Sequence, residues 1–85
     1  MHTVELLEQA MELAARLGYT IRQDSMAGHG GYCELKGKKL FFLDLDLGPD
    51  DQLEQLVDTL RLDPATASQP IPEGLRPLLR KLEFE

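Results

Sequence analysis

The sequence predicts an α+β domain in which a three-stranded antiparallel sheet packs against amphipathic helices, with the element order α-β-β-β-α-α. Leucine-rich stripes with helical spacing lie towards both ends of the chain, and apolar segments separated by glycine-rich turns lie between them. The 85 residues, 42% hydrophobic and 28% charged, have the composition of a folded protein with one small core. Residues 1–85 are therefore expected to form a single domain.

The first helix is expected between Thr3, as its N-cap, and Gly18, as its stop signal. Its apolar stripe has spacings of four, three and four residues and consists of Leu6, Ala10, Leu13 and Leu17. The opposite face is acidic, whereas a helix that lies on a membrane surface needs a basic polar face. This helix is therefore expected to face the core.

Three strands are expected in the middle of the chain. Residues 19–24 alternate β-formers with polar residues, and residues 32–35 and 40–45 flank the turn "KGKK", where Gly37 can take a positive φ. The last of these segments opens with four apolar residues, which is typical of a central strand. Because sequential strands usually pair, we expect an antiparallel meander, although the longer connection "SMAGHGG" permits another order.

Two further helices are expected in the second half. One begins at Pro49 and ends at Asp63, before Pro64, and its stripe is Leu53, Leu56, Val57 and Leu60. After a linker, "ATASQPIPEG", the same stripe recurs in Leu75, Leu78, Leu79 and Leu82. Pro77 fits this last helix only in its first turn.

The charge distribution disfavours nucleic acid as a partner. The net charge is −6, and the whole acidic excess lies in residues 44–85, which carry ten acidic and four basic side chains. Binding to nucleic acid requires clustered Lys and Arg to neutralise phosphates. No signal peptide or apolar run long enough to span a membrane is recognisable, and the single cysteine excludes an internal disulfide, so a cytoplasmic location without membrane partners is expected.

The end of the third expected strand carries two aspartates two residues apart. The run "LFFLDLDLGPDD" resembles the opening motif of the haloacid dehalogenase phosphatases, which implies Asp44 as nucleophile and Asp46 as general acid. The chain offers too few residues for the doubly wound sheet and the later motifs of those enzymes. The favoured interpretation is a strand end whose aspartates meet solvent or cap the following helix.

The glycine-rich loop Gly28–Gly31 is the second candidate site. It could cradle a phosphate, but a strand rather than a helix follows it, so the helix dipole that such sites use is missing. His29 and Cys33, with Asp24, form a candidate metal-binding set. An offset of four along a strand spans roughly 13 Å, so these ligands need a sharp fold of the chain. The favoured interpretation of this stretch is a structural turn with a partly buried Cys33.

The run "GGYCELKGKKLFFLD" resembles a pattern found in small bacterial αβ proteins, extending over residues 28–62. The resemblance implies a short αβ domain and a bacterial origin. It brings no activity and no site residues with it.

The leading interpretation is a small non-enzymatic interaction or regulatory module that self-associates or binds another protein, without a cofactor. Apolar residues beyond the main core elements predict more apolar surface than one subunit hides; these are Ile71, Leu82 and Phe84. In a homodimer, the only basic cluster could face acidic residues of the second copy; the cluster is Lys36, Lys38 and Lys39, and the acidic residues are Asp50 and Asp51. The alternative is a small-ligand- or metal-binding protein that uses loop 28–31 with His29 and Cys33.

Overall fold

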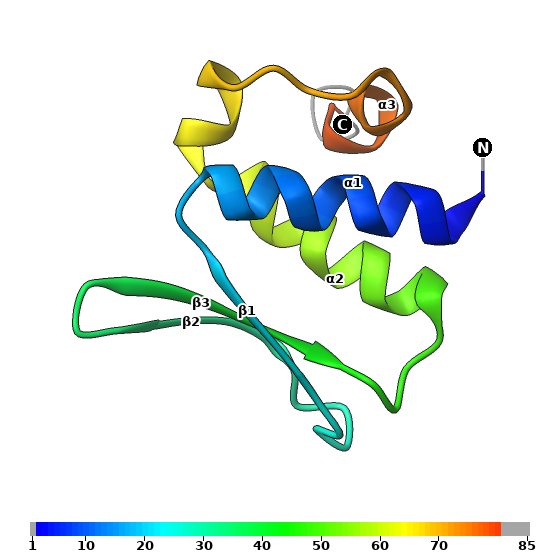
Figure 1. Ribbon diagram of the computed structural model, residues 1–85, viewed down its shortest axis with the longest axis vertical. Helices are drawn as coiled ribbons and strands as arrows, with labels where there is room; N and C mark the ends of the chain where they lie inside the picture. Colours follow the sequence, from blue (N-terminus) through cyan, green and yellow to red (C-terminus); the bar gives the residue numbers. More distant parts are fainter. Residues whose placement is uncertain (1, 81–85) are drawn as a thin grey trace.

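The computed structural model describes residues 2–80 (Figure 1). Its elements are α1 (Thr3–Arg16), β1 (Thr20–Asp24), β2 (Gly31–Leu35), β3 (Lys38–Asp44), α2 (Pro49–Leu62), the 3-10 turns η1 (Pro64–Ser68) and η2 (Glu73–Leu75), and α3 (Arg76–Leu79). The helices pack on a three-stranded sheet. The α+β class and the element order predicted from the sequence are confirmed.

The sheet is mixed, with the strand order β1-β3-β2. β3 is central, as expected, and its hairpin partner β2 runs antiparallel to it. β1 runs parallel to β3, from Thr20 opposite Leu40 to Asp24 opposite Asp44, so the expected antiparallel meander is wrong for this strand. The physical reason is that residues 25–30 are long enough to cross two strand spacings, roughly 10 Å, and to leave the apolar β3 between β1 and β2.

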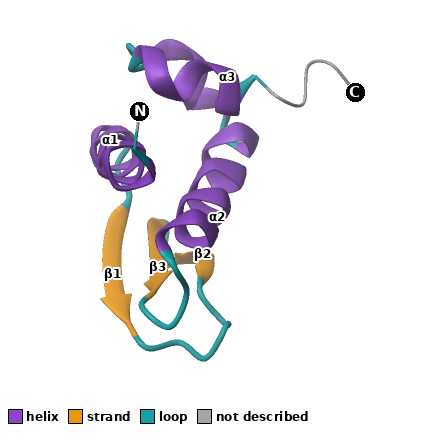
Figure 2. Cartoon of the chain, turned by 90° about the vertical axis from the view of Figure 1, so that its right-hand side faces the viewer, coloured by secondary structure: helices purple, strands orange, loops and turns teal. Residues whose placement is uncertain are grey.

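The core lies between one face of the sheet and the helices α1 and α2. Phe41 and Leu43 of β3 are buried there, together with Leu13 of α1 and Leu56 of α2. Figure 2 shows both helices on this side of the sheet, with α3 further out over them. Since side chains alternate along a strand, Leu40 and Phe42 lie on the opposite face, which no helix within residues 2–80 covers.

The boundaries of the two long helices follow local signals. α2 begins at Pro49 and ends before Asp63, as predicted. α1 has His2 as its N-cap and no side-chain cap, so Thr3 is its first helical residue and the predicted capping role is wrong. Gly18 leaves the helix with a φ of 96°. No helix within residues 2–80 is long and apolar enough to cross a membrane.

The expected third helix is short. α3 has one turn, with Pro77 near its start as predicted, and the preceding linker forms the turns η1 and η2. Leu75 is fully buried, and Ile71 is partly buried against the core rather than among the large exposed apolar side chains. The expected apolar residues Leu82 and Phe84 lie outside the described residues.

Candidate functional site

A buried carboxylate lies at the end of β3. The Asp44 side chain has no exposed surface and accepts backbone N–H groups of Met26 at 2.9 Å, Gly28 at 2.6 Å and Asp46 at 2.9 Å. It lies on the sheet face opposite the helices, where loop residues 25–30 cover it. The expectation that Asp44 meets solvent or caps the next helix is therefore wrong, because the glycine-rich loop supplies its hydrogen-bond donors.

The loop is closed on carboxylates of its own chain. Asp46 accepts the Ser25 hydroxyl at 2.9 Å and the Ala27 N–H at 3.0 Å. The Ser25 N–H donates to Asp24, and the His29 N–H donates to a loop carbonyl. Every backbone N–H from residue 25 to residue 29 thus has an acceptor within the chain. The backbone N–H groups of the loop bind an anion, but that anion is the Asp44 carboxylate of the same chain rather than a phosphate.

This arrangement gives Asp44 and Asp46 a structural role. Burial raises the pKa of the Asp44 carboxyl, but the N–H groups of Met26, Asp46 and Gly28, with the nearby His29, outweigh burial and lower it below its usual value. A nucleophile needs free access to substrate, and the Asp44 oxygens are enclosed by their donors. The phosphatase roles implied by the strand-end motif therefore find no support in the geometry.

Gly30 lets the loop lie directly on β3. A Cβ atom at this position would be 2.6 Å from the Phe42 carbonyl oxygen and 3.1 Å from the Asp44 Cβ. The loop therefore packs against the backbone of the central strand with no room for a side chain. The sequence offered the two signals, a glycine cluster and an Asp-x-Asp strand end, but only the parallel pairing of β1 with β3 brings them together.

The three residues of the candidate metal set are all exposed. Asp24 ends β1, His29 lies in the loop, and Cys33 lies in the middle of β2 opposite Leu40, with its sulfur 3.9 Å from the Glu34 carbonyl oxygen. Within residues 2–80, no group of three or more His, Cys, Asp and Glu side chains is placed to hold a metal ion. Metal binding by Asp24, His29 and Cys33 stays a prediction without an assembled ligand set.

Cys33 is exposed, so the expectation that it is partly buried is wrong. Its register with Leu40 places it on the sheet face away from the helices, and β2 is an edge strand. Neither property can be read from the local sequence, because both depend on which strand becomes the sheet centre.

An aromatic cluster beside β2 was not found by sequence reasoning. The Tyr19 hydroxyl donates to Asp63 at 2.8 Å, and the Lys39 ammonium lies 2.8 Å from the same carboxylate and 5.1 Å from the Tyr19 ring centroid. Lys39 lowers the pKa of Asp63, whereas burial and Asp63 raise that of Tyr19. Tyr32 stacks edge-on against Tyr19 at 5.7 Å. These residues and the exposed Leu62 line a hollow of about 420 Å³ at the β2 side of the sheet.

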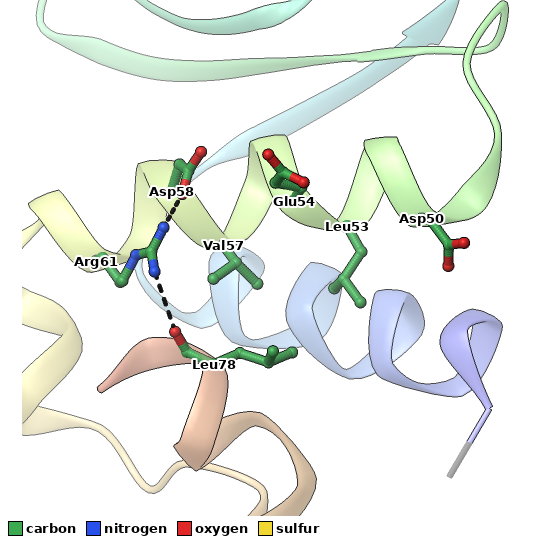
Figure 3. Close-up of a pocket in the computed structure, with 7 residues that line it drawn as sticks. All are labelled: Asp50, Leu53, Glu54, Val57, Asp58, Arg61 and Leu78. Atoms are coloured by element: carbon green, nitrogen blue, oxygen red, sulfur yellow. Dashed lines mark hydrogen bonds and ion pairs between the residues drawn. The ribbon is translucent and has the colours of Figure 1, made fainter. Parts of the chain in front are cut away.

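A smaller hollow of about 220 Å³ lies between α2 and α3 (Figure 3). An acidic stripe of α2 borders it, formed by Asp50, Glu54 and Asp58. Arg61 pairs with Asp58 and donates to the Leu78 carbonyl at 3.3 Å. Arg61 therefore holds α3 against α2, which is a structural role.

The exposed side of β2 is the remaining candidate. Every β2 residue except Gly31 is exposed, and the Leu35 side chain is 56% exposed. We call the uncovered sheet surface around it the open face; its residues are Arg22, Cys33, Leu35, Lys38, Leu40 and Phe42. Comparison with protein-family models, with curated proteins and with solved structures gives no match to this chain.

Proposed function

We propose that this chain is a small non-enzymatic interaction module that self-associates through the open face and the adjacent edge of β2. The observation that carries the proposal is a sheet that the helices within residues 2–80 cover on one side only, and whose edge strand β2 is exposed along four of its five residues. A sheet edge presents unpaired backbone groups that favour pairing with another strand.

Apolar exposure supports an interaction role. Leu35 and Tyr32 of β2 are 56% and 46% exposed, and Leu62 at the neighbouring end of α2 is 77% exposed. Covering such side chains is favourable by roughly 25 cal/mol per Å² of apolar surface. Leu35 lies on the open face, whereas Tyr32, opposite Phe41, lies on the helix side of the same edge, beside Leu62. Exposed apolar side chains therefore flank the β2 edge on both sides, which favours an edge that is covered in an assembly.

A non-enzymatic role is supported by the contacts of the side chains that could otherwise act in catalysis. The paired aspartates Asp44 and Asp46 accept the N–H groups that would otherwise bind an anionic ligand. Lys39 and Asp63 neutralise each other beside Tyr19. The aspartates stabilise the fold at one end of β3, and the Lys39–Asp63 pair stabilises it at the other end. The surface proposed for recognition is the open face with the edge of β2.

A concentration series of light-scattering measurements tests this function. The mass is expected to rise from that of the 9.6 kDa monomer towards twice that value as concentration increases. Leu35→Lys should weaken association at least about tenfold, because it replaces a covered apolar side chain with a charge. Val4→Lys is the matched control: Val4 is 53% exposed on α1, and its replacement should leave association unchanged.

A strictly monomeric chain at about 1 mM, a weak-association limit, would contradict the proposed function. Equal effects of Leu35→Lys and Val4→Lys would show that net charge, rather than the β2 surface, controls association. Circular dichroism should confirm that both variants keep the fold, since both positions are exposed.

A further inference from the structure

No strand within residues 2–80 pairs with the outer edge of β2, and this edge has a defined pattern of outward backbone groups. Lys36 and Gly37 form a two-residue hairpin turn with φ of 51° and 77°, as a type I′ turn requires. Such a turn closes on a hydrogen-bonded pair, here Leu35 and Lys38, and bonded and non-bonded pairs alternate from there. The N–H and C=O groups of Tyr32 and Glu34 therefore point away from β3, towards the free edge.

We infer that two copies of this chain associate by antiparallel pairing of their β2 strands about a two-fold axis at Cys33. The pairing makes one continuous sheet from both copies, with the helices of both on the same side. The inference rests on the proposed function and specifies its partner and its geometry.

The register follows from the outward backbone groups. With Cys33 opposite Cys33 of the second copy, Tyr32 faces Glu34, and both outward-facing residues of each strand form hydrogen-bonded pairs. In a register displaced by two residues, either Tyr32 faces Tyr32 of the second copy or Glu34 faces Glu34. The other outward-facing residue of each strand then has no strand residue opposite it. The register with its two-fold axis at Cys33 therefore forms more backbone hydrogen bonds than the displaced registers.

The direction of pairing follows from charge. The hairpin end of the sheet carries Lys36 and Lys38, and the opposite end carries the exposed Asp46, which follows β3, and, on the far strand β1, Asp24. Antiparallel pairing places the basic end of each copy beside the acidic end of the other, whereas parallel pairing would place lysines beside lysines. An antiparallel pair of identical strands is also a closed, self-complementary interface.

The side chains of β2 fit this arrangement. Leu35 lies opposite Gly31 of the second copy, where no side chain competes for the space, and Glu34 faces a tyrosine rather than another carboxylate. The other edge strand, β1, has Arg22 at its centre. The equivalent two-fold pairing of β1 would place like charges directly opposite each other, which is destabilising. β2 is therefore the edge that fits a second copy.

Disulfide cross-linking tests the register. Opposite residues of a non-hydrogen-bonded pair have Cα atoms about 4.5 Å apart, within the range that a disulfide spans. With copper phenanthroline and dissolved oxygen as the oxidant, we expect Cys33 to cross-link two copies at least about ten times faster than a cysteine one position later, in the chain carrying Cys33→Ser and Glu34→Cys. That control cysteine lies two residues out of register with its counterpart.

The outcomes separate the two proposals. Fast cross-linking at Cys33, slowed by Leu35→Lys and unaffected by Val4→Lys, supports the pairing. If the mass rises with concentration but Cys33 cross-links no faster than the control cysteine, the two-fold pairing is wrong and self-association stands. If the mass stays that of a monomer, the proposed function itself fails, whatever the cross-linking rate.

Discussion

Replacing Asp44 with alanine is expected to lower the melting temperature by more than about 10 °C. The change removes the acceptor for the N–H groups of Met26, Gly28 and Asp46 and leaves them beside a buried gap. Unsatisfied buried donors are costly, and hydrogen bonds to charged acceptors are the stronger ones. Thermal unfolding followed by circular dichroism measures the effect at pH 7, with Glu54→Gln, an exposed carboxylate of α2, as the control.

The same carboxylate should make the fold sensitive to acid. Because the pKa of Asp44 is lower in the folded chain than in the unfolded chain, its contribution to stability is fully present above the unfolded value, about 3.9. That contribution is lost as the pH falls through the lower, folded value. Asp44→Asn should therefore lose less stability between pH 5 and pH 2 than the parent chain. A melting temperature of Asp44→Ala within about 2 °C of the parent would show that loop closure does not depend on this side chain.

Replacing Gly30 with alanine is expected to destabilise the fold by about 1–3 kcal/mol, the usual cost of forcing an extra carbon into a packed site. The new Cβ would lie 2.6 Å from the Phe42 carbonyl oxygen, and this atom is backbone of the central strand, so the loop must move. Because the loop carries the donors to Asp44, movement also weakens those hydrogen bonds. Urea unfolding at constant pH measures the change in the free energy of unfolding.

Gly48→Ala is the matched control for this substitution. Gly48 precedes α2 with a φ of −72°, and a Cβ atom there would meet nothing within 4 Å. Its replacement should change the free energy of unfolding by less than about 0.5 kcal/mol. Equal losses at Gly30 and Gly48 would contradict close packing of the loop on β3.

The elements that depend on local signals were predictable from the sequence. The stripe that follows Pro49 and ends before Pro64 fixes α2, and the glycine of the "KGKK" turn fixes the β2–β3 hairpin. The direction of β1 was not predictable, because it depends on how residues 25–30 cross the end of the sheet. That path is held by hydrogen bonds to Asp44, a residue far away in the sequence.

The candidate site was predictable to a similar degree. Periodicity places Asp44 and Asp46 on one side of the strand end, and the glycines mark a loop that can hold an anion. That the anion is the chain's own carboxylate follows only from the tertiary pairing. In the same way, the local pattern marks β2 as a strand, but its position at the sheet edge is a property of the strand order.

Amide hydrogen exchange at the β2 edge is the most direct test of the central claim, that this edge pairs with a second copy. The amides of Tyr32 and Glu34 should exchange freely in dilute solution and at least about tenfold more slowly at a concentration where the mass has doubled. The amides of Cys33 and Leu35, which face β3, should be protected at both concentrations. Exchange at Tyr32 and Glu34 that does not change with concentration would contradict the account.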